Sequence, residues 1–314
     1  MATRHFIPML LLLWTTTDKD SLYLIDLEPQ GGPILTLLMM THETVQGFEA
    51  LTGSLSSRKV GALDFARAMT GRVIQARQTI SGSNPPEGIF AFSHNLVGVT
   101  EWFLDAMLNV ASPMLRRTFE RMNYLTEFAL LLRSISLAFE KGRVPKDVQL
   151  SVHDLALLLK VVTGTIDRNY RAPHNWGRLV EGKIEETCTR ILRDAPTKDG
   201  PAYGHMSPTL GALEFFSVYP AVVNHMIAWD HEGHNSIRNV AMHLPDTEHT
   251  IRLKQLLVEG AKRADIYSGF RDSHQLFICD NSSVVQWFEV AHRLIIPTLP
   301  ISLYQDLSDS LYSL

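Results

Sequence analysis

Cysteine is scarce in this chain: only Cys188 and Cys279 occur among its 314 residues. One pair cannot build a disulfide framework, and no CxxC spacing is present for zinc binding or dithiol chemistry. The patterns GxGxxG, GxxxxGK[ST], HExxH and GxSxG and the EF-hand loop are also missing. These absences remove the common nucleotide-binding, zinc-protease and hydrolase motifs. With so few cysteines we expect a reducing, cytoplasmic location.

An excess of basic charge is also lacking. The 29 lysines and arginines are outnumbered by 33 aspartates and glutamates, which gives a net charge of −4. Binding to a phosphate backbone needs clustered basic charge, so we expect no nucleic-acid partner. The apolar run from Phe6 to Trp14, FIPMLLLLW, is far too short to span a bilayer, and we expect no membrane association. No A-x-A cleavage site follows, which favours a buried first strand or helix over a signal peptide.

Between clusters of proline and glycine, apolar residues recur at helical spacing, and alternating β-branched runs are few. Ser151 followed by Asp154 is typical of a capping box that begins a helix. We find no internal repeat. The sequence predicts one all-α domain over residues 1–314, with about nine or ten helices. The clearest helices are expected over 34–54, 59–80, 96–111, 113–140, 152–166, 177–194, 208–229, 247–263 and 282–294.

Histidine is unusually frequent, with 13 residues. For any single histidine the ordinary interpretation is a side chain satisfied by a hydrogen bond. Several histidines in apolar or small-residue surroundings together favour a functional site. They are His42, His94, His205, His225, His231 and His234.

A haem site would explain such histidines. Haem needs an imidazole on iron, an apolar slot for the porphyrin, and cations or helix N-termini for the two propionates. A helical, histidine-rich chain with few cysteines can supply these groups. Because no CxxCH motif is present, the haem would be the non-covalent b type.

The segment 34–51, ILTLLMMTHETVQGFEAL, resembles the distal-histidine segment of the tryptophan 2,3-dioxygenase superfamily, whose pattern is H-x-x-x-E-L-W-F. His42 stands at the histidine of that pattern. A second partial copy is His94 with Glu101-Trp102-Phe103. The resemblance covers about half of the chain and implies a helical fold around a haem pocket.

Within that superfamily, the chain length and Ser93-His94-Asn95 are most similar to the haem-dependent tyrosine hydroxylases, which make L-DOPA for bacterial natural products such as antibiotics. The resemblance implies a haem b iron, hydrogen peroxide or oxygen as oxidant, and a small aromatic amino acid, L-tyrosine, as substrate. It gives His94 the role of distal base for the phenol proton. A homo-oligomer is compatible with the sequence.

The residue that ligates the iron is left open between two histidines. His205 follows Gly204, where a missing side chain would let a porphyrin approach. His225 lies in an apolar segment, with Val218, Ala221 and Trp229 at helical spacing. We favour His205 and keep His225 as the alternative. The candidate cations for the carboxylates are Arg171, Arg178, Arg238 and Arg271.

Two other functions remain open. His153-Asp154 and the segments PHNW at 173–176 and DHEGHN at 230–235 resemble parts of HD-type metal-dependent phosphohydrolases. That chemistry needs His and Asp to converge on two metal ions. The second histidine of the family pattern is replaced here by Arg178. The other alternative is a haem-free helical interaction protein.

Overall fold

The fold is entirely helical in the part of the chain that the structure describes. The computed structural model describes residues 6–25, 27, 32–57, 59–110, 113–144, 151–164, 172–195, 200–226 and 237–272. These ranges hold fourteen helices, and their only extended pairing is an isolated bridge between Thr17 and Tyr23. The all-α prediction is therefore confirmed, but the number of helices is larger than the nine or ten expected.

The chain divides into two compact units, residues 1–265 and 266–314. The description below concerns the first unit. The expected helix over 282–294 lies outside the described residues. The helices are α1 (Phe6–Thr15), α2 (Pro33–Glu43), α3 (Val45–Ser57), α4 (Lys59–Ser81), α5 (Gly88–Val110), α6 (Pro113–Arg121), α7 (Tyr124–Glu140), α8 (Val152–Gly164), α9 (Ala172–Glu181), α10 (Ile184–Asp194), α11 (Pro201–Phe216), α12 (Pro220–Met226), α13 (Ile237–Met242) and α14 (Glu248–Asp272), which continues into the second unit.

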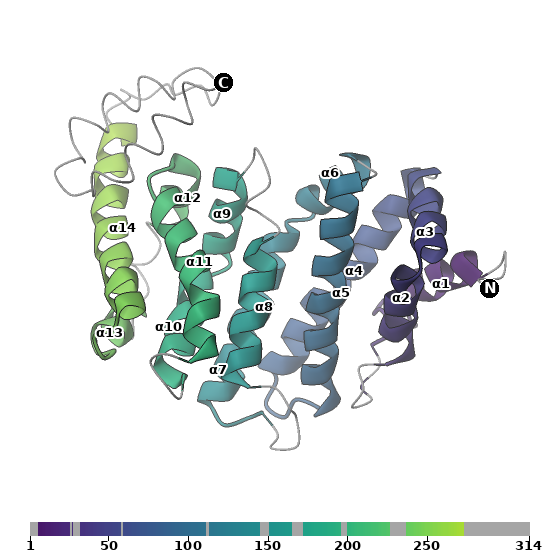
Figure 1. Ribbon diagram of the computed structural model, residues 1–314, viewed down its shortest axis with the longest axis horizontal. Coiled ribbons are helices and arrows are strands. Elements are labelled where there is room, and N and C mark those ends of the chain that lie inside the picture. The colour runs from purple at the N-terminus through teal and green to yellow at the C-terminus, as the bar shows by residue number, and fades with distance from the viewer. Residues whose placement is uncertain are drawn as a thin grey trace. The chain divides into compact units, whose positions relative to one another are not determined.

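A three-helix unit recurs along the chain from α4 to α12. Helices α4, α7 and α10 pack side by side in one row, and α5, α8 and α11 form a second row (Figure 1). The rows are joined pairwise, α4 to α5, α7 to α8 and α10 to α11. A short helix closes each of the first two units: α6 packs on α4 and α7, as α9 packs on α7 and α10. In the third unit the short helix α12 packs on α9 instead. This neighbour-to-neighbour stacking is the architecture of an α-solenoid.

The joints between these units share one backbone conformation. Asn123 precedes α7 with φ 53°, and Lys183 precedes α10 with φ 62°. Each residue ends a tight turn that its own amide closes: Asn123 N–H donates to Glu120 O, and Lys183 N–H donates to Val180 O. Positive φ is uncommon for residues with a side chain, and only Ser21 shares it among the described non-glycine residues. The matching joints support the repeat independently of the packing.

Several of the expected helices are divided or displaced in the structure. The helix expected over 96–111 begins at Gly88. The range 113–140 is broken at Asn123 into α6 and α7, and 177–194 is broken at Lys183 into α9 and α10. The range 34–54 is interrupted at Thr44. The helix expected to begin near Pro208 begins at Pro201 instead, and Pro208 lies inside α11. Proline fits the first helical turn because its missing N–H has no partner there, and Pro201 already fills that position.

Ion pairs join the first row of helices between α7 and α10. The Glu186 carboxylate accepts hydrogen bonds from Arg133 Nε at 2.7 Å and from both terminal nitrogens of Arg190 at 3.1 Å. The Glu140 carboxylate accepts from Arg190 Nε at 2.9 Å and from Arg193 Nη1 at 2.8 Å. Neighbouring units are thus connected by charge as well as by apolar packing.

The apolar N-terminal segment forms a buried helix, as the sequence predicts. Ile7, Leu10 and Trp14 of α1 are buried, and Trp14 Nε1 donates to Phe65 O at 3.2 Å. The Arg72 guanidinium lies 4.0 Å from the Trp14 ring centre, and its Nη1 donates to Trp14 O at 2.8 Å. Helix α1 is therefore fixed to α4. None of the described helices is long and apolar enough to cross a membrane.

Candidate functional site

The candidate site begins at the N-terminal end of α8. The Asp154 carboxylate accepts hydrogen bonds from Ser151 N–H at 2.7 Å and from Ser151 Oγ at 2.6 Å, while Asp154 N–H donates to Ser151 Oγ at 3.2 Å. This reciprocal pattern confirms the predicted capping box. Burial alone would raise the pKa of Asp154, but the hydrogen bonds from Ser151 and the nearby charges of His94 and His153 bring that pKa below its ordinary value.

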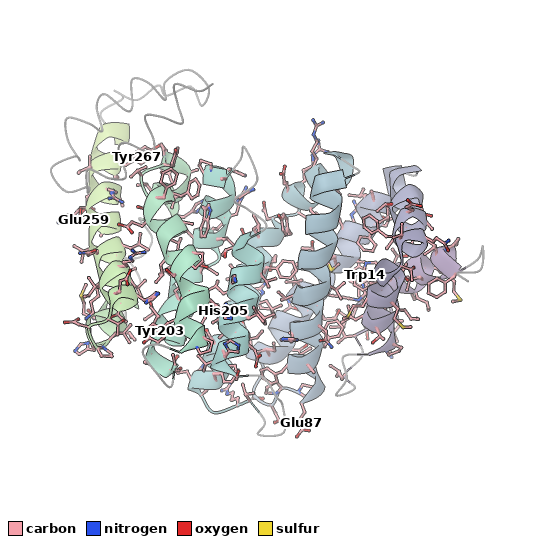
Figure 2. The ribbon with its side chains drawn as sticks, viewed as in Figure 1. Trp14, Glu87, Tyr203, His205, Glu259 and Tyr267 are labelled. Carbon is pink, nitrogen blue, oxygen red and sulfur yellow. The ribbon has the colours of Figure 1, made fainter. Side chains whose placement is uncertain are left out.

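Two imidazoles meet where α8 and α11 pack together. The ring of His153 is exposed, and the half-buried ring of His205 lies against it with 5.0 Å between the ring centres and a tilt of 33°. Figure 2 labels His205. Partial burial, followed by the positive charges of Lys160 and His153, lowers the pKa of His205. His205 is therefore mostly neutral at pH 7.

His94 reaches the same end of α8 from α5. Its ring is half-buried, its Nδ1 lies 3.4 Å from Asn95 Oδ1, and its charge acts on Asp154. Ser93 is buried, and its hydroxyl donates to Ile89 O at 2.7 Å, a hydrogen bond within α5. The second row of helices thus brings together two histidines that the sequence singled out. We call His94, His153, Asp154 and His205 the α8 cluster.

His225 lies in different surroundings, on α12 against α9. Its ring is half-buried, although Val222, Val223 and Met226 around it are buried. A side chain at Gly177 would lie 2.4 Å from Ala221 O and 3.6 Å from His225 Cδ2, so the helices meet closely at that glycine. Burial lowers the pKa of His225, and the charge of Glu181 opposes this. His225 and His205 share no described neighbour, so only His205 belongs to the α8 cluster.

Several other predicted site residues cannot be placed. His231, His234 and Arg171 lie outside the described residues, as do the side chains of His42, Arg238 and Arg271. Arg178, the remaining candidate cation, donates to Glu181 Oε2 at 2.8 Å, and this carboxylate also accepts from Thr126. Arg178 is thus already paired within the protein.

The sequence did not predict that His153 lies beside His205, because His153 was considered only as part of an HD pair. Recognition of the repeat would have predicted this contact, because α8 and α11 are equivalent helices of successive units and such helices lie side by side. Within the described ranges no group of three or more His, Cys, Asp or Glu residues could hold a metal ion. The carboxylate of Asp154 is instead used by Ser151.

The surroundings of His205 do not fit a haem b group. Haem b lies in an apolar slot with an imidazole directed at its iron. The described neighbours of the His205 ring are instead the imidazole of His153 and the charge of Lys160, at a half-exposed position. Gly204 beside it is exposed, with open space where a side chain would be. The α8 cluster is a surface of imidazoles and small residues.

A comparison of the chain with protein-family models, curated proteins and solved structures found no match.

Proposed function

We propose that this protein is a helical-repeat scaffold that binds a polypeptide segment across the exposed sides of α8 and α11. The observation that carries the proposal is the recurring three-helix unit with its matching joints at Asn123 and Lys183. Solenoids of this kind present extended surfaces, and these surfaces are what repeat proteins use for binding. The proposal corresponds to the haem-free interaction protein considered from the sequence.

The exposed residues of this face suit a polypeptide. On α8, His153, Leu157 and Lys160 are exposed at helical spacing, and Leu157 is a large apolar side chain with 36% of its surface exposed. On α11 four of the five exposed positions are small or apolar, namely Pro201, Gly204, Pro208 and Phe215, and the fifth is Glu214. Few charges would need to be desolvated, and imidazole and apolar groups can contact both backbone and side chains of a bound segment.

Peptide selection followed by a matched pair of substitutions tests the proposal. Peptides from a random displayed library would be selected on the purified chain, and their binding measured by fluorescence anisotropy. We expect saturable binding of one peptide per chain, weakened at least about tenfold by Leu157→Glu, because a buried interface position would then hold an unpaired charge. Gln78→Glu, at an exposed position of α4, is the control and should leave the affinity unchanged. Equal affinities for both variants would contradict the proposal.

The haem-dependent tyrosine hydroxylase is the second candidate. One observation favours it: His94 and His205, its predicted distal base and iron ligand, lie at the same end of α8. The half-buried position of His205, beside the His153 ring and the charge of Lys160, disfavours it, and we derive no catalytic step from it.

Hemin titration distinguishes the two candidates. The scaffold proposal predicts that wild type and His205→Ala give the same weak absorbance change, because no apolar slot holds the porphyrin. His225→Ala is the matched control. A stoichiometric complex with a Soret band that only His205→Ala abolishes would favour the enzyme. Formation of L-DOPA from L-tyrosine and peroxide, lost in His94→Phe by about 10²–10⁴-fold, would then assign His94 as the base.

A further inference from the structure

We propose that His153 and His205 bind one divalent transition-metal ion, such as Zn²⁺ or Ni²⁺, and thereby connect α8 to α11. This site shares His153 with the surface proposed to bind a peptide, but its test requires no peptide. It joins two neighbouring units of the repeat through side chains rather than through apolar packing.

The separation of the two rings is the one that shared coordination requires. A zinc–nitrogen bond is about 2.0–2.1 Å, so two imidazoles bound to one ion at a tetrahedral angle have ring centres about 5 Å apart. The ring centres of His153 and His205 are 5.0 Å apart, with the planes tilted by 33°.

The chemistry of the two side chains agrees with this geometry. Neutral imidazole is a ligand that suits zinc, copper and nickel. The two imidazoles lie side by side on neighbouring helices, which brings two such ligands to one place. Because His153 is exposed, an ion can reach the pair directly from solvent.

Water would fill the remaining coordination positions. Asp154 is the nearest carboxylate in sequence, but hydrogen bonds from Ser151 hold it, and His94 acts on it from α5. Within the described ranges no third protein ligand completes a site. We therefore expect weaker binding than at a structural zinc site with four protein ligands.

Calorimetric titration of the full, untagged chain with ZnCl₂ and NiCl₂ tests the site. We expect one ion per chain at the tightest step, with affinity reduced more than about tenfold in both His153→Ala and His205→Ala. His243→Ala is the matched control, because His243 is exposed and its ring contacts the carbonyl of Asn239 outside the α8 cluster. Metal should also raise the melting temperature of the wild type and of His243→Ala only.

A second measurement protects the test against unfolding of a variant. Substoichiometric Cu²⁺ should broaden the ring proton resonances of His153 and His205 in the wild-type NMR spectrum before those of other histidines. Circular dichroism without metal should be the same for wild type and His153→Ala, since His153 is exposed. Unchanged affinity in both cluster variants, or first broadening at other histidines, would overturn the proposal.

Discussion

The Glu185→Gln variant should be more stable than the wild type at pH 8 by about 3–5 kcal/mol, and equally stable near pH 4. Glu185 is buried in α10, and neither carboxylate oxygen accepts a hydrogen bond from another described residue. Burial raises the pKa of this carboxyl to about 8 from an ordinary value of 4.5. The expected difference in the free energy of unfolding follows from this pKa difference, because each pKa unit corresponds to about 1.4 kcal/mol.

The sign follows from which state releases its proton first. As pH rises from about 4.5 to 8, Glu185 ionises in the unfolded chain but stays protonated in the folded one, so the free energy of unfolding falls. Above pH 8 both states are ionised, and this contribution becomes constant. Glutamine has no proton to lose. Burial raises the pKa of the Cys188 thiol, which therefore stays protonated throughout this range.

Chemical denaturation at a series of pH values measures the difference. The neighbouring Glu186→Gln is the control, because Glu186 accepts hydrogen bonds from Arg133 and Arg190 and should lose stability when its charge is removed. Wild-type and Glu185→Gln curves that run parallel from pH 4 to pH 8 would show that Glu185 is hydrated or paired in solution.

Trp14→Ala should lower the free energy of unfolding by about 3–5 kcal/mol, the usual cost of truncating a buried tryptophan. The Trp14 ring is fully buried and is stacked on Phe65 with 5.4 Å between ring centres. The Arg72 guanidinium also lies over this ring. Removal of the ring leaves a cavity and an uncovered buried cation between α1 and α4.

Hydrogen exchange and denaturation together locate this effect. Exchange should accelerate in α1 and in the part of α4 around Phe65 and Arg72, while α10 and α11 keep their protection. Leu12→Ala is the control on the same helix, because 66% of Leu12 is exposed and its truncation should change stability by less than about 0.5 kcal/mol. A Trp14→Ala variant as stable as Leu12→Ala would mean that α1 does not contribute to the core.

The sequence predicted helices well where they follow common rules of spacing and capping. Ser151 and Asp154 identified the start of α8, and the apolar period identified α4. The joints at Asn123 and Lys183 were missed because a left-handed turn is ordinarily marked by glycine, and these positions carry asparagine and lysine. Without the joints, α6 with α7 and α9 with α10 were merged, and the repeat was not recognised.

For the same reason the sequence could not predict which of its candidate residues lie together. His94 and His205 stand out in the sequence by their local surroundings. Their proximity depends on α5, α8 and α11 being neighbours in one row, which is a property of the stacking and not of any segment alone. His153 lies at the centre of that row, in a capping segment that has an ordinary structural explanation.

The rows of helices also separate α1 from α11, and these two helices pack on different neighbours. Helix α1 contacts α2, α3 and α4, whereas α11 contacts α8, α9 and α10. A displacement at Trp14 can reach His205 only through the intervening helices, and each interface absorbs part of it. In a linear array such as this, energetic coupling decays with each neighbour passed. A molecule bound at the α8 cluster should therefore contact the same surface in the wild type and in Trp14→Ala.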